Sequence, residues 1–314
     1  MSRLFSAACL LFIALSLNAA AQTQPQPQLR VLTSIKPLQL IAAAVQDGLS
    51  EPEVLLPPGA SPHHYALRPS DVRSVRDADL LYWIGPDLES FLPRVMNGSA
   101  KTSVKVQDLP GLSLRHFADA HANEHDGHAE MADQHDHNHR PGSLDAHLWL
   151  LPANALVIAR KMAADLAVAD PANAARYQAN VEAFASRLAT LDQRLKSRLQ
   201  GLADKPYFVF HEAYDYFEAA YGLKHAGVFS VLGEVQPGAK HVAAMRERLQ
   251  HAGPTCVFSE PPLLPRLAKT LTAGLPVTLA EMDAMGGSLP VNAKGYEALL
   301  DNLAGELAGC LEAL

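Results

Sequence analysis

Short apolar runs alternate with amphipathic stretches along most of this chain, and turn-forming residues separate them. Short apolar runs bounded by Gly, Pro, Asn or Asp are typical of buried strands, whereas apolar residues spaced by three and four predict helices. We expect strands at 29–34, 54–56, 79–84 and 103–106, and again at 207–210, 227–229, 256–259 and 277–280. Strands that alternate with helices predict βαβ units and parallel sheets.

Helices are expected between these strands. They should open at Pro37 and Arg68, the latter with Asp71 in its first turn, where the helix dipole favours a negative charge. Further helices should cover 87–96, 152–168, 240–251 and 265–273, with a last helix from about Asn292. The two series of strands and helices predict an α/β fold with two Rossmann-like lobes, each a mostly parallel sheet with flanking helices.

One long helix is expected between the two series. Its start is marked by Asp170 as N-cap and Pro171 at the first helical position. A single apolar stripe then follows at Tyr177, Val181, Phe184, Leu188, Leu191, Leu195 and Leu199. Roughly 30 residues at 1.5 Å each would span about 45 Å, which suits a rigid strut between lobes. An ordinary long surface helix is the alternative interpretation.

The N-terminus has the pattern of a secretory signal peptide. Arg3 precedes an apolar run, 4–17, and the small residues of 18–21 form a cleavage pattern. Cys9 lies inside the apolar run, which argues against a lipoprotein. We therefore expect signal peptide 1–21, an N-terminal lobe 22–169, a linking helix 170–202 and a C-terminal lobe 203–314. The mature chain should lie in the periplasm, and it has no apolar run long enough for a transmembrane segment.

A polar tract at 116–140 interrupts the N-terminal lobe and contains almost no large apolar residue. Such a segment cannot compensate the entropy of ordering, so we expect a mobile loop. Half of the 14 histidines of the chain belong to it: His116, His121, His125, His128, His135, His137 and His139. Aspartates and glutamates separate these histidines, and a tract of this kind is typical of weak, multi-site metal binding. A solvated linker without function is the alternative.

Charge and cysteine content narrow the class of partner. The formal net charge of −7 argues against nucleic acid or anionic lipid, which need a clustered basic surface. Cys9 would leave with the signal peptide, so Cys256 and Cys310 remain as a pair in an oxidising compartment. We expect a disulfide between them, which stabilises by about 4 kcal/mol in the chain-entropy account. Two buried reduced thiols are the alternative.

Metal-binding side chains follow several of the predicted strands, at the sheet edge where α/β proteins bind ligands. His63 and His64 follow the strand at 54–56, His211 follows 207–210, and Asp283 follows 277–280. His147 comes soon after the polar tract. Three imidazoles and one carboxylate suit four-coordinate zinc, whereas manganese prefers more oxygen ligands. Copper(II) and nickel(II) also bind imidazole, so ligand type alone does not select zinc.

Several longer motifs carry a family resemblance over nearly all of the mature chain. They are the segments GASPHHYALRPSD at 59–71, DAHLWL at 145–150, FHEAY at 210–214, QPGA at 236–239, CVFSEP at 256–261 and the pair Met282-Asp283. With these motifs the chain resembles the zinc-specific solute-binding proteins of bacterial ABC importers, the ZnuA type.

The resemblance implies the residues and partners of a zinc site. His63 rather than His64 would be the first ligand, His147 the second, His211 the third and Asp283 the possible fourth, in a cleft between two lobes joined by a rigid helix. It also implies a disulfide between Cys256 and Cys310. The partners would be an ABC permease and its ATPase, both separate chains, and we expect a monomer.

Two details of the resemblance bear on the choice of metal. The manganese-binding relatives have a glutamate where this chain has His211, and the His-rich insertion is typical of the zinc branch. Some relatives carry an acidic residue, which can serve as an extra ligand, where this chain has Pro62.

Two other functions remain open from the sequence. A zinc enzyme would also use three protein ligands and an open position. The segment from His211 to Asp215 approaches H-E-x-x-H, but Asp215 stands where the second histidine is required. A surface metal buffer or adhesin that never meets a transporter is the other possibility.

Overall fold

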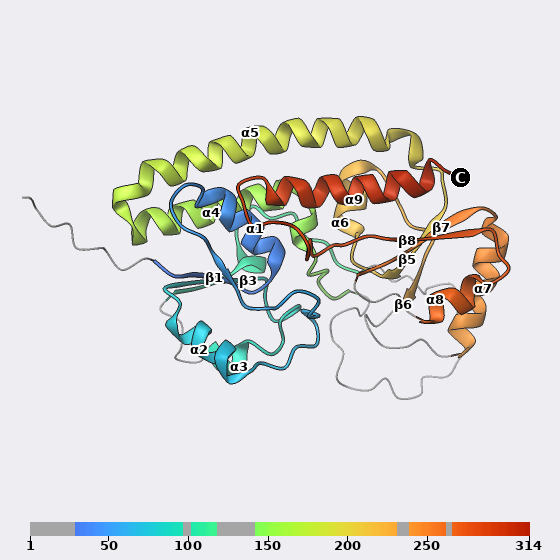
Figure 1. Cartoon of the computed structure of the whole chain (residues 1–314), viewed down its shortest axis with the longest axis horizontal. Helices are drawn as coiled ribbons and strands as arrows, with labels where there is room; N and C mark the ends of the chain where they lie inside the picture. The colour runs from blue at the N-terminus through green and yellow to red at the C-terminus, as the bar shows by residue number, and fades with distance from the viewer. Residues whose placement is uncertain (1–28, 97–101, 118–141, 231–238, 262–265) are drawn as a thin grey trace, which may run out of the picture.

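The computed structural model describes residues 29–96, 102–117, 142–230, 239–261 and 266–314, and these form two lobes, each built on a four-stranded sheet (Figure 1). The first sheet has the order β2-β1-β3-β4, with β1 at Val31–Thr33, β2 at Glu53–Val54, β3 at Leu80–Trp83 and β4 at Thr102–Lys105. All of its neighbouring strands are parallel, in agreement with the predicted βαβ units. The expected signal peptide, 1–21, lies outside the described residues.

The second sheet repeats this plan in the C-terminal lobe. Its order is β6-β5-β7-β8, again with parallel neighbours, and its strands are β5 at Tyr207–His211, β6 at Gly227–Ser230, β7 at Thr255–Ser259 and β8 at Val277–Glu281. The connecting helices are α6 at Asp215–Tyr221, α7 at Ala239–Ala252 and α8 at Arg266–Thr272. Both sheets therefore have the topology that the alternation of strands and helices predicts.

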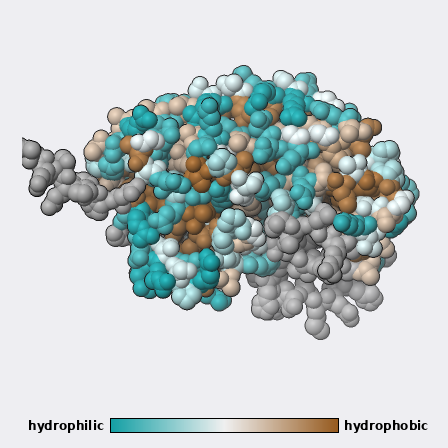
Figure 2. Space-filling model, viewed as in Figure 1, coloured by the Kyte–Doolittle hydropathy of each residue, from teal (hydrophilic) through white to brown (hydrophobic). Residues whose placement is uncertain are grey.

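The helices of the N-terminal lobe differ from the prediction in one place. The structure has α1 at Lys36–Val45 and α2 at Pro69–Asp77, and Asp71 accepts the backbone N–H of Arg68 as a first-turn capping residue. The helix expected over 87–96 is reduced to α3 at Pro93–Met96. Proline at the first helical position of α3 disfavours helical conformation in the residue before it. In the preceding turns, the buried carboxylate of Glu89 accepts the backbone N–H groups of Ile84 and Gly85. Figure 2 shows a mainly hydrophilic surface over α2 and α3.

Two long helices lie between the two series of strands in the chain. Helix α4, Pro152–Ala169, packs against α5, Ala174–Leu199, and α5 extends over both lobes (Figure 1). A 3₁₀ turn at Pro171–Asn173 precedes α5, and Asp170 makes no side-chain cap to the backbone there. Asp170 is the N-cap residue of this turn and Pro171 opens it, as predicted, but the Asp170 carboxylate accepts hydrogen bonds from the side chains of Asn173 and Tyr177 and not from the backbone.

The last helix, α9 at Gly295–Leu311, also contacts both lobes. It packs on α1 of the N-terminal lobe, on α5, and on β7 and β8 of its own lobe. Arg187 on α5 pairs with Glu297 on α9 at 2.6 Å, and Arg194 pairs with Asp301 at 3.1 Å. No helix within the described residues is both long enough and apolar enough to cross a bilayer.

The core of the molecule continues from one lobe into the other. All seven residues of the predicted α5 stripe are buried, and they belong to one cluster that also contains residues of α1, α4, α6 and α9. A smaller cluster fills the space between the second sheet and α7 and α8, with Phe208, Phe229 and Leu249 among its members. The predicted disulfide is present between Cys256 on β7 and Cys310 on α9 and joins the second sheet to the last helix.

Candidate metal centre

Three histidines from distant parts of the chain meet where the two lobes face each other. His63 lies in the segment after β2, His147 just before the 3₁₀ turn Leu148–Leu150, and His211 is the last residue of β5. The ring centroids are 5.4 Å apart for His63 and His147, 5.3 Å for His63 and His211, and 4.9 Å for His147 and His211. One ligand nitrogen from each ring lies within 4.8 Å of the others.

Local structure separates His63 from its neighbour His64. The backbone N–H of His63 donates to Ser61 Oγ at 3.2 Å, in a turn shaped by Pro62. His63 is 6% exposed, whereas His64 is exposed to solvent and its ring centroid lies 6.4 Å from that of His63. The structure therefore brings His63 and not His64 to the other two histidines.

The ring of His147 is held by Asp145. Asp145 Oδ1 accepts from His147 Nδ1 at 2.8 Å and from the backbone N–H of the same residue at 3.0 Å. Both residues are buried, and the Trp149 ring packs against the His147 ring at a centroid distance of 5.3 Å. Burial lowers the pKa of His147 well below its ordinary value and raises the pKa of Asp145 to about 7. His147 is therefore a neutral imidazole at physiological pH, the form that binds metals.

His211 has a carboxylate partner of its own. Its Nδ1 donates to Glu260 Oε1 at 3.0 Å, and the Tyr214 hydroxyl lies 3.3 Å from the same oxygen. Burial by itself raises the pKa of Glu260, but the rings of His211 and His147 and the Tyr214 hydroxyl together hold that pKa below the usual value. Glu260 follows β7, so the second sheet supplies both the ligand and its partner.

These carboxylates determine which nitrogen can bind an ion. Because Nδ1 of His147 and Nδ1 of His211 donate to carboxylates, Nε2 is the nitrogen of each ring that is left to bind an ion, and such an arrangement orients a ring and increases its basicity. A tetrahedral zinc ion with bonds of about 2.1 Å separates its ligands by roughly 3.4 Å. The three histidines approach that spacing and supply the nitrogen-rich set that zinc prefers.

Asp283 lies outside this group of three. Its Oδ1 accepts the backbone N–H of Met285 and of Gly286, at 2.9 and 2.8 Å, and its Oδ2 accepts that of Gly287 at 2.8 Å. Among the described residues, the group whose ligand atoms all lie within 4.8 Å of one another contains the three histidines and not Asp283. Oδ2 has only one of these bonds, so a lone pair remains on it.

Of the seven histidines of the polar tract, only His116 is placed. It is exposed and forms an isolated antiparallel bridge with Leu144, the residue before Asp145. The tract histidines outside the described residues are His121, His125, His128, His135, His137 and His139.

Two residues of the centre were not predicted as functional. Asp145 and Glu260 both occur in the sequence motifs, Asp145 in DAH, which ends at His147, and Glu260 in SEP, at the end of β7. A carboxylate two residues before a candidate histidine was a signal for Asp145. No local signal was available for Glu260, which comes 49 residues after His211.

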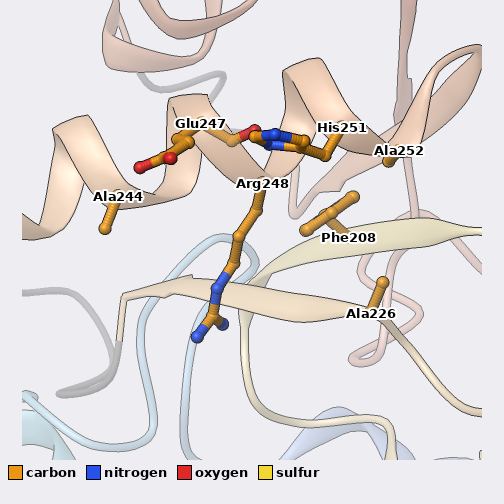
Figure 3. Close-up of a pocket in the computed structure, with 7 residues that line it drawn as sticks. All are labelled: Phe208, Ala226, Ala244, Glu247, Arg248, His251 and Ala252. Carbon is orange, nitrogen blue, oxygen red and sulfur yellow. The ribbon is translucent and has the colours of Figure 1, made fainter. Parts of the chain in front are cut away.

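A surface hollow beside α7 is separate from this centre. It is lined by Phe208, Ala226, Ala244, Glu247, Arg248, His251 and Ala252. Figure 3 shows Glu247 and His251 along α7, with Arg248 extending toward the sheet. None of the three clustered histidines lines it.

Solved structures share this fold over nearly the whole chain. A structure titled "Crystal structure of ZnuA" aligns with a TM-score of 0.74 and 21% identity, covering 90% of this chain and 99% of that chain. The FpvC protein of Pseudomonas aeruginosa, in complex with Mn²⁺, also has a TM-score of 0.74, with 20% identity and 91% and 99% coverage. The fold, with its two parallel sheets and long connecting helix, is that of a two-lobe solute-binding protein.

Sequence comparison identifies the family within that class. The family model described as "Zinc-uptake complex component A periplasmic" matches residues 31–310. The chain belongs to this family, whose members are solute-binding components of transport systems.

Curated relatives cover the chain almost completely. The high-affinity zinc uptake system protein ZnuA of Yersinia pestis is 36% identical over 291 residues, covering 90% of this chain and 91% of the relative. The protein of the same name from Paracoccus denitrificans is 35% identical over 322 residues, with coverage of 96% and 98%.

Proposed function

We propose that this protein is the periplasmic zinc-binding component of an ABC importer, which captures Zn(II) and delivers it to a membrane permease. The observation that carries the proposal is the meeting of His63, His147 and His211, from both lobes, with ligand nitrogens within 4.8 Å of one another. Membership of the zinc-uptake family supports zinc as the cargo.

In this proposal His63, His147 and His211 bind the ion, and Asp283 or a water molecule completes a four-coordinate shell. For Asp283 to bind, Oδ2 would use its remaining lone pair while the backbone N–H of Gly287 stays bonded to it. Its position just after β8 supports this role. The Nε2 atom of each histidine must be unprotonated to bind the ion. Zinc capture therefore weakens in acid, because imidazolium cannot ligate.

The proposal extends to the other parts of the chain. Residues 1–21 would direct export, 22–169 and 203–314 would form the two lobes, and 170–202 would link them. The His-rich tract, 116–140, would scavenge zinc weakly and hand it over to the centre. The permease and the ATPase would be separate chains, and the protein would act as a monomer.

The protein is proposed to transport zinc and not to catalyse a reaction. The segment from His211 to Asp215 resembles the protease motif H-E-x-x-H, but Asp215 stands where the second histidine is required. Assays of the zinc-loaded protein for hydrolase and lyase activity should detect no turnover. Turnover abolished by His211→Ala would refute this part of the proposal.

Calorimetric titration of zinc into the mature protein tests the central claim. The wild type should show one tight site, and His63→Ala and His211→Ala should each remove it. His64→Ala is the matched control, because His64 neighbours the site but is exposed and lies outside the group. Equal loss of the tight site in His64→Ala, or its retention in His63→Ala, would contradict the assignment.

Import is separated from simple metal buffering by a cellular measurement. A deletion strain should lose high-affinity zinc uptake, and the wild-type gene should restore it where His147→Ala does not. Normal uptake in the deletion strain would favour a surface buffer.

A further inference from the structure

A second group of potential metal ligands lies on α6 and in the segment that follows it. Asp215 is the first residue of the helix, Glu218 lies one turn further on, and His225 precedes β6. One ligand atom from each of these residues lies within 4.8 Å of the others, the same criterion that the three histidines meet. Glu218 is 3% exposed, and the side chain of His225 is 11% exposed.

Glu218 and His225 already face each other. Nδ1 of His225 lies 2.9 Å from Oε1 and 3.0 Å from Oε2 of Glu218, and the backbone N–H of His225 donates to Oε1 at 3.1 Å. The Tyr207 hydroxyl donates to the same oxygen at 2.5 Å. A nitrogen and a carboxylate are thus aligned with a single proton between them, and Tyr207 fixes the carboxylate.

Asp215 supplies a third potential metal ligand, which an ordinary ion pair between Glu218 and His225 does not need. Within the described part of the chain its carboxylate accepts no hydrogen bond, although one of its oxygens lies within 4.8 Å of a ligand atom of each member of the pair. Asp215 also stands at the position where H-E-x-x-H would have its second histidine. The fold therefore groups this carboxylate with Glu218 and His225 and not with the three histidines.

The chemistry of this group suits a divalent cation. Zinc binds imidazole nitrogen and carboxylate oxygen at about 2.0 to 2.2 Å, so two ligands of one ion lie roughly 3.3 Å apart. Nδ1 of His225 and Oε1 of Glu218 are 2.9 Å apart, so they would move apart by only about 0.4 Å if an ion replaced the proton between them. Two oxygens and one nitrogen select zinc less strongly than three imidazoles do, because oxygen ligands also suit harder cations.

The group lies close to the segment that carries the second zinc ligand. Tyr216, next to Asp215, donates its hydroxyl to the backbone carbonyl of Asp145 at 3.0 Å and accepts the backbone N–H of Arg115 at 2.8 Å. Arg115 directly precedes His116, where the polar tract begins. Helix α6 therefore contacts the chain on both sides of the polar tract, at Arg115 before the tract and at Asp145 shortly before His147.

We propose that Asp215, Glu218 and His225 form a second Zn(II) site, separate from the three-histidine centre and of lower affinity. This site goes beyond the proposed transport function and stands without it.

Zinc stoichiometry of the mature protein tests the second site. Equilibrium dialysis at a fixed micromolar concentration of free zinc should give one equivalent less for His225→Gln than for the wild type. The matched control is His251→Gln, an exposed histidine that lies outside every described ligand group, which should leave the stoichiometry unchanged. The polar tract contributes equally to all three proteins, so it cancels in the comparison.

A second variant guards against a folding defect, since His225 also pairs with Glu218. Asp215→Asn removes a carboxylate that forms no described hydrogen bond, and it should lower the zinc stoichiometry in the same way, because the ion loses a charged oxygen ligand. Anomalous scattering from zinc-grown crystals should show an ion between Asp215, Glu218 and His225 that is lost in His225→Gln and kept in His63→Ala. The absence of that ion in the wild type, with unchanged stoichiometry in both variants, would overturn the proposal. The ion at the three histidines is read separately in the same crystals.

Discussion

The carboxylate of Asp145 binds His147 twice, through ring Nδ1 at 2.8 Å and through the backbone N–H at 3.0 Å. Both bonds are made to one oxygen, Oδ1, in a buried setting, and they fix the ring and the main chain of the same residue together. The imidazole is therefore oriented before any ion arrives, so binding zinc costs little additional side-chain entropy.

We expect Asp145→Asn to weaken zinc binding at the centre tenfold to a hundredfold. The amide keeps the shape of the side chain but loses the negative charge that makes the His147 ring a better donor. Competition with a chelator of known affinity measures the change, and Asp108→Asn, at an exposed carboxylate paired with Lys105, is the control. An unchanged affinity in Asp145→Asn would mean that Asp145 does not support the ligand.

Zinc should change the overall shape of the protein only slightly. Helices α5 and α9 both pack across the lobes, and the Arg187–Glu297 pair joins them, so a wide hinge motion would disrupt a continuous core. A folded chain of this size has a radius of gyration of roughly 19 Å, and we expect zinc to change it by less than about 1 Å. Small-angle scattering with and without zinc measures this, with His63→Ala as the control. A larger, zinc-dependent contraction would contradict the rigid strut.

Glu89 should make stability depend on pH. Burial raises its pKa to about 7, despite hydrogen bonds from Gly85, Ser34 and Ile84 that lower it. Because the folded pKa exceeds the unfolded value, the stabilisation is complete below about pH 4.5 and is lost as the pH rises through about 7. A shift of this size corresponds to about 3 kcal/mol.

Urea denaturation of the wild type and Glu89→Gln at pH 5 and pH 8 measures this effect. From pH 5 to pH 8, the free energy of unfolding of Glu89→Gln should rise by about 3 kcal/mol relative to that of the wild type. Glu51→Gln, at an exposed position, should show no such movement. A difference that is the same at both pH values would show that Glu89 does not titrate in this range.

The disulfide should stabilise the C-terminal lobe substantially. It closes a loop with a sequence separation of 54 residues, for which the chain-entropy account gives about 4 kcal/mol. We expect the double variant Cys256→Ser, Cys310→Ser to lose free energy of unfolding of this order. Reducing agent should lower the stability of the wild type to a similar extent and leave the double variant unchanged. Equal stability of the two proteins under oxidising conditions would rule out this contribution.

The elements with a strong local pattern were predicted well. The strands of both sheets and the stripe from Tyr177 to Leu199 follow from the spacing of apolar residues, since burial of one face imposes that spacing. The prediction that failed depends on the burial of one carboxylate. The helix over 87–96 is shortened because the buried Glu89 turns inward to accept backbone N–H groups and the hydroxyl of Ser34, a residue 55 positions earlier that no local spacing brings to it.

The sequence alone determined the α/β class, the long connecting helix, the paired cysteines and the histidines that can bind a metal, because each rests on residue type or on spacing within one element. Only the tertiary structure decided which of these groups meet. It brought His63, His147 and His211 together, left His64 exposed, assigned Asp145 and Glu260 to the ligand rings, and joined Asp215 to Glu218 and His225. The reason is physical: proximity between residues up to 148 positions apart is created by packing two sheets under α5 and α9, and no local pattern encodes it.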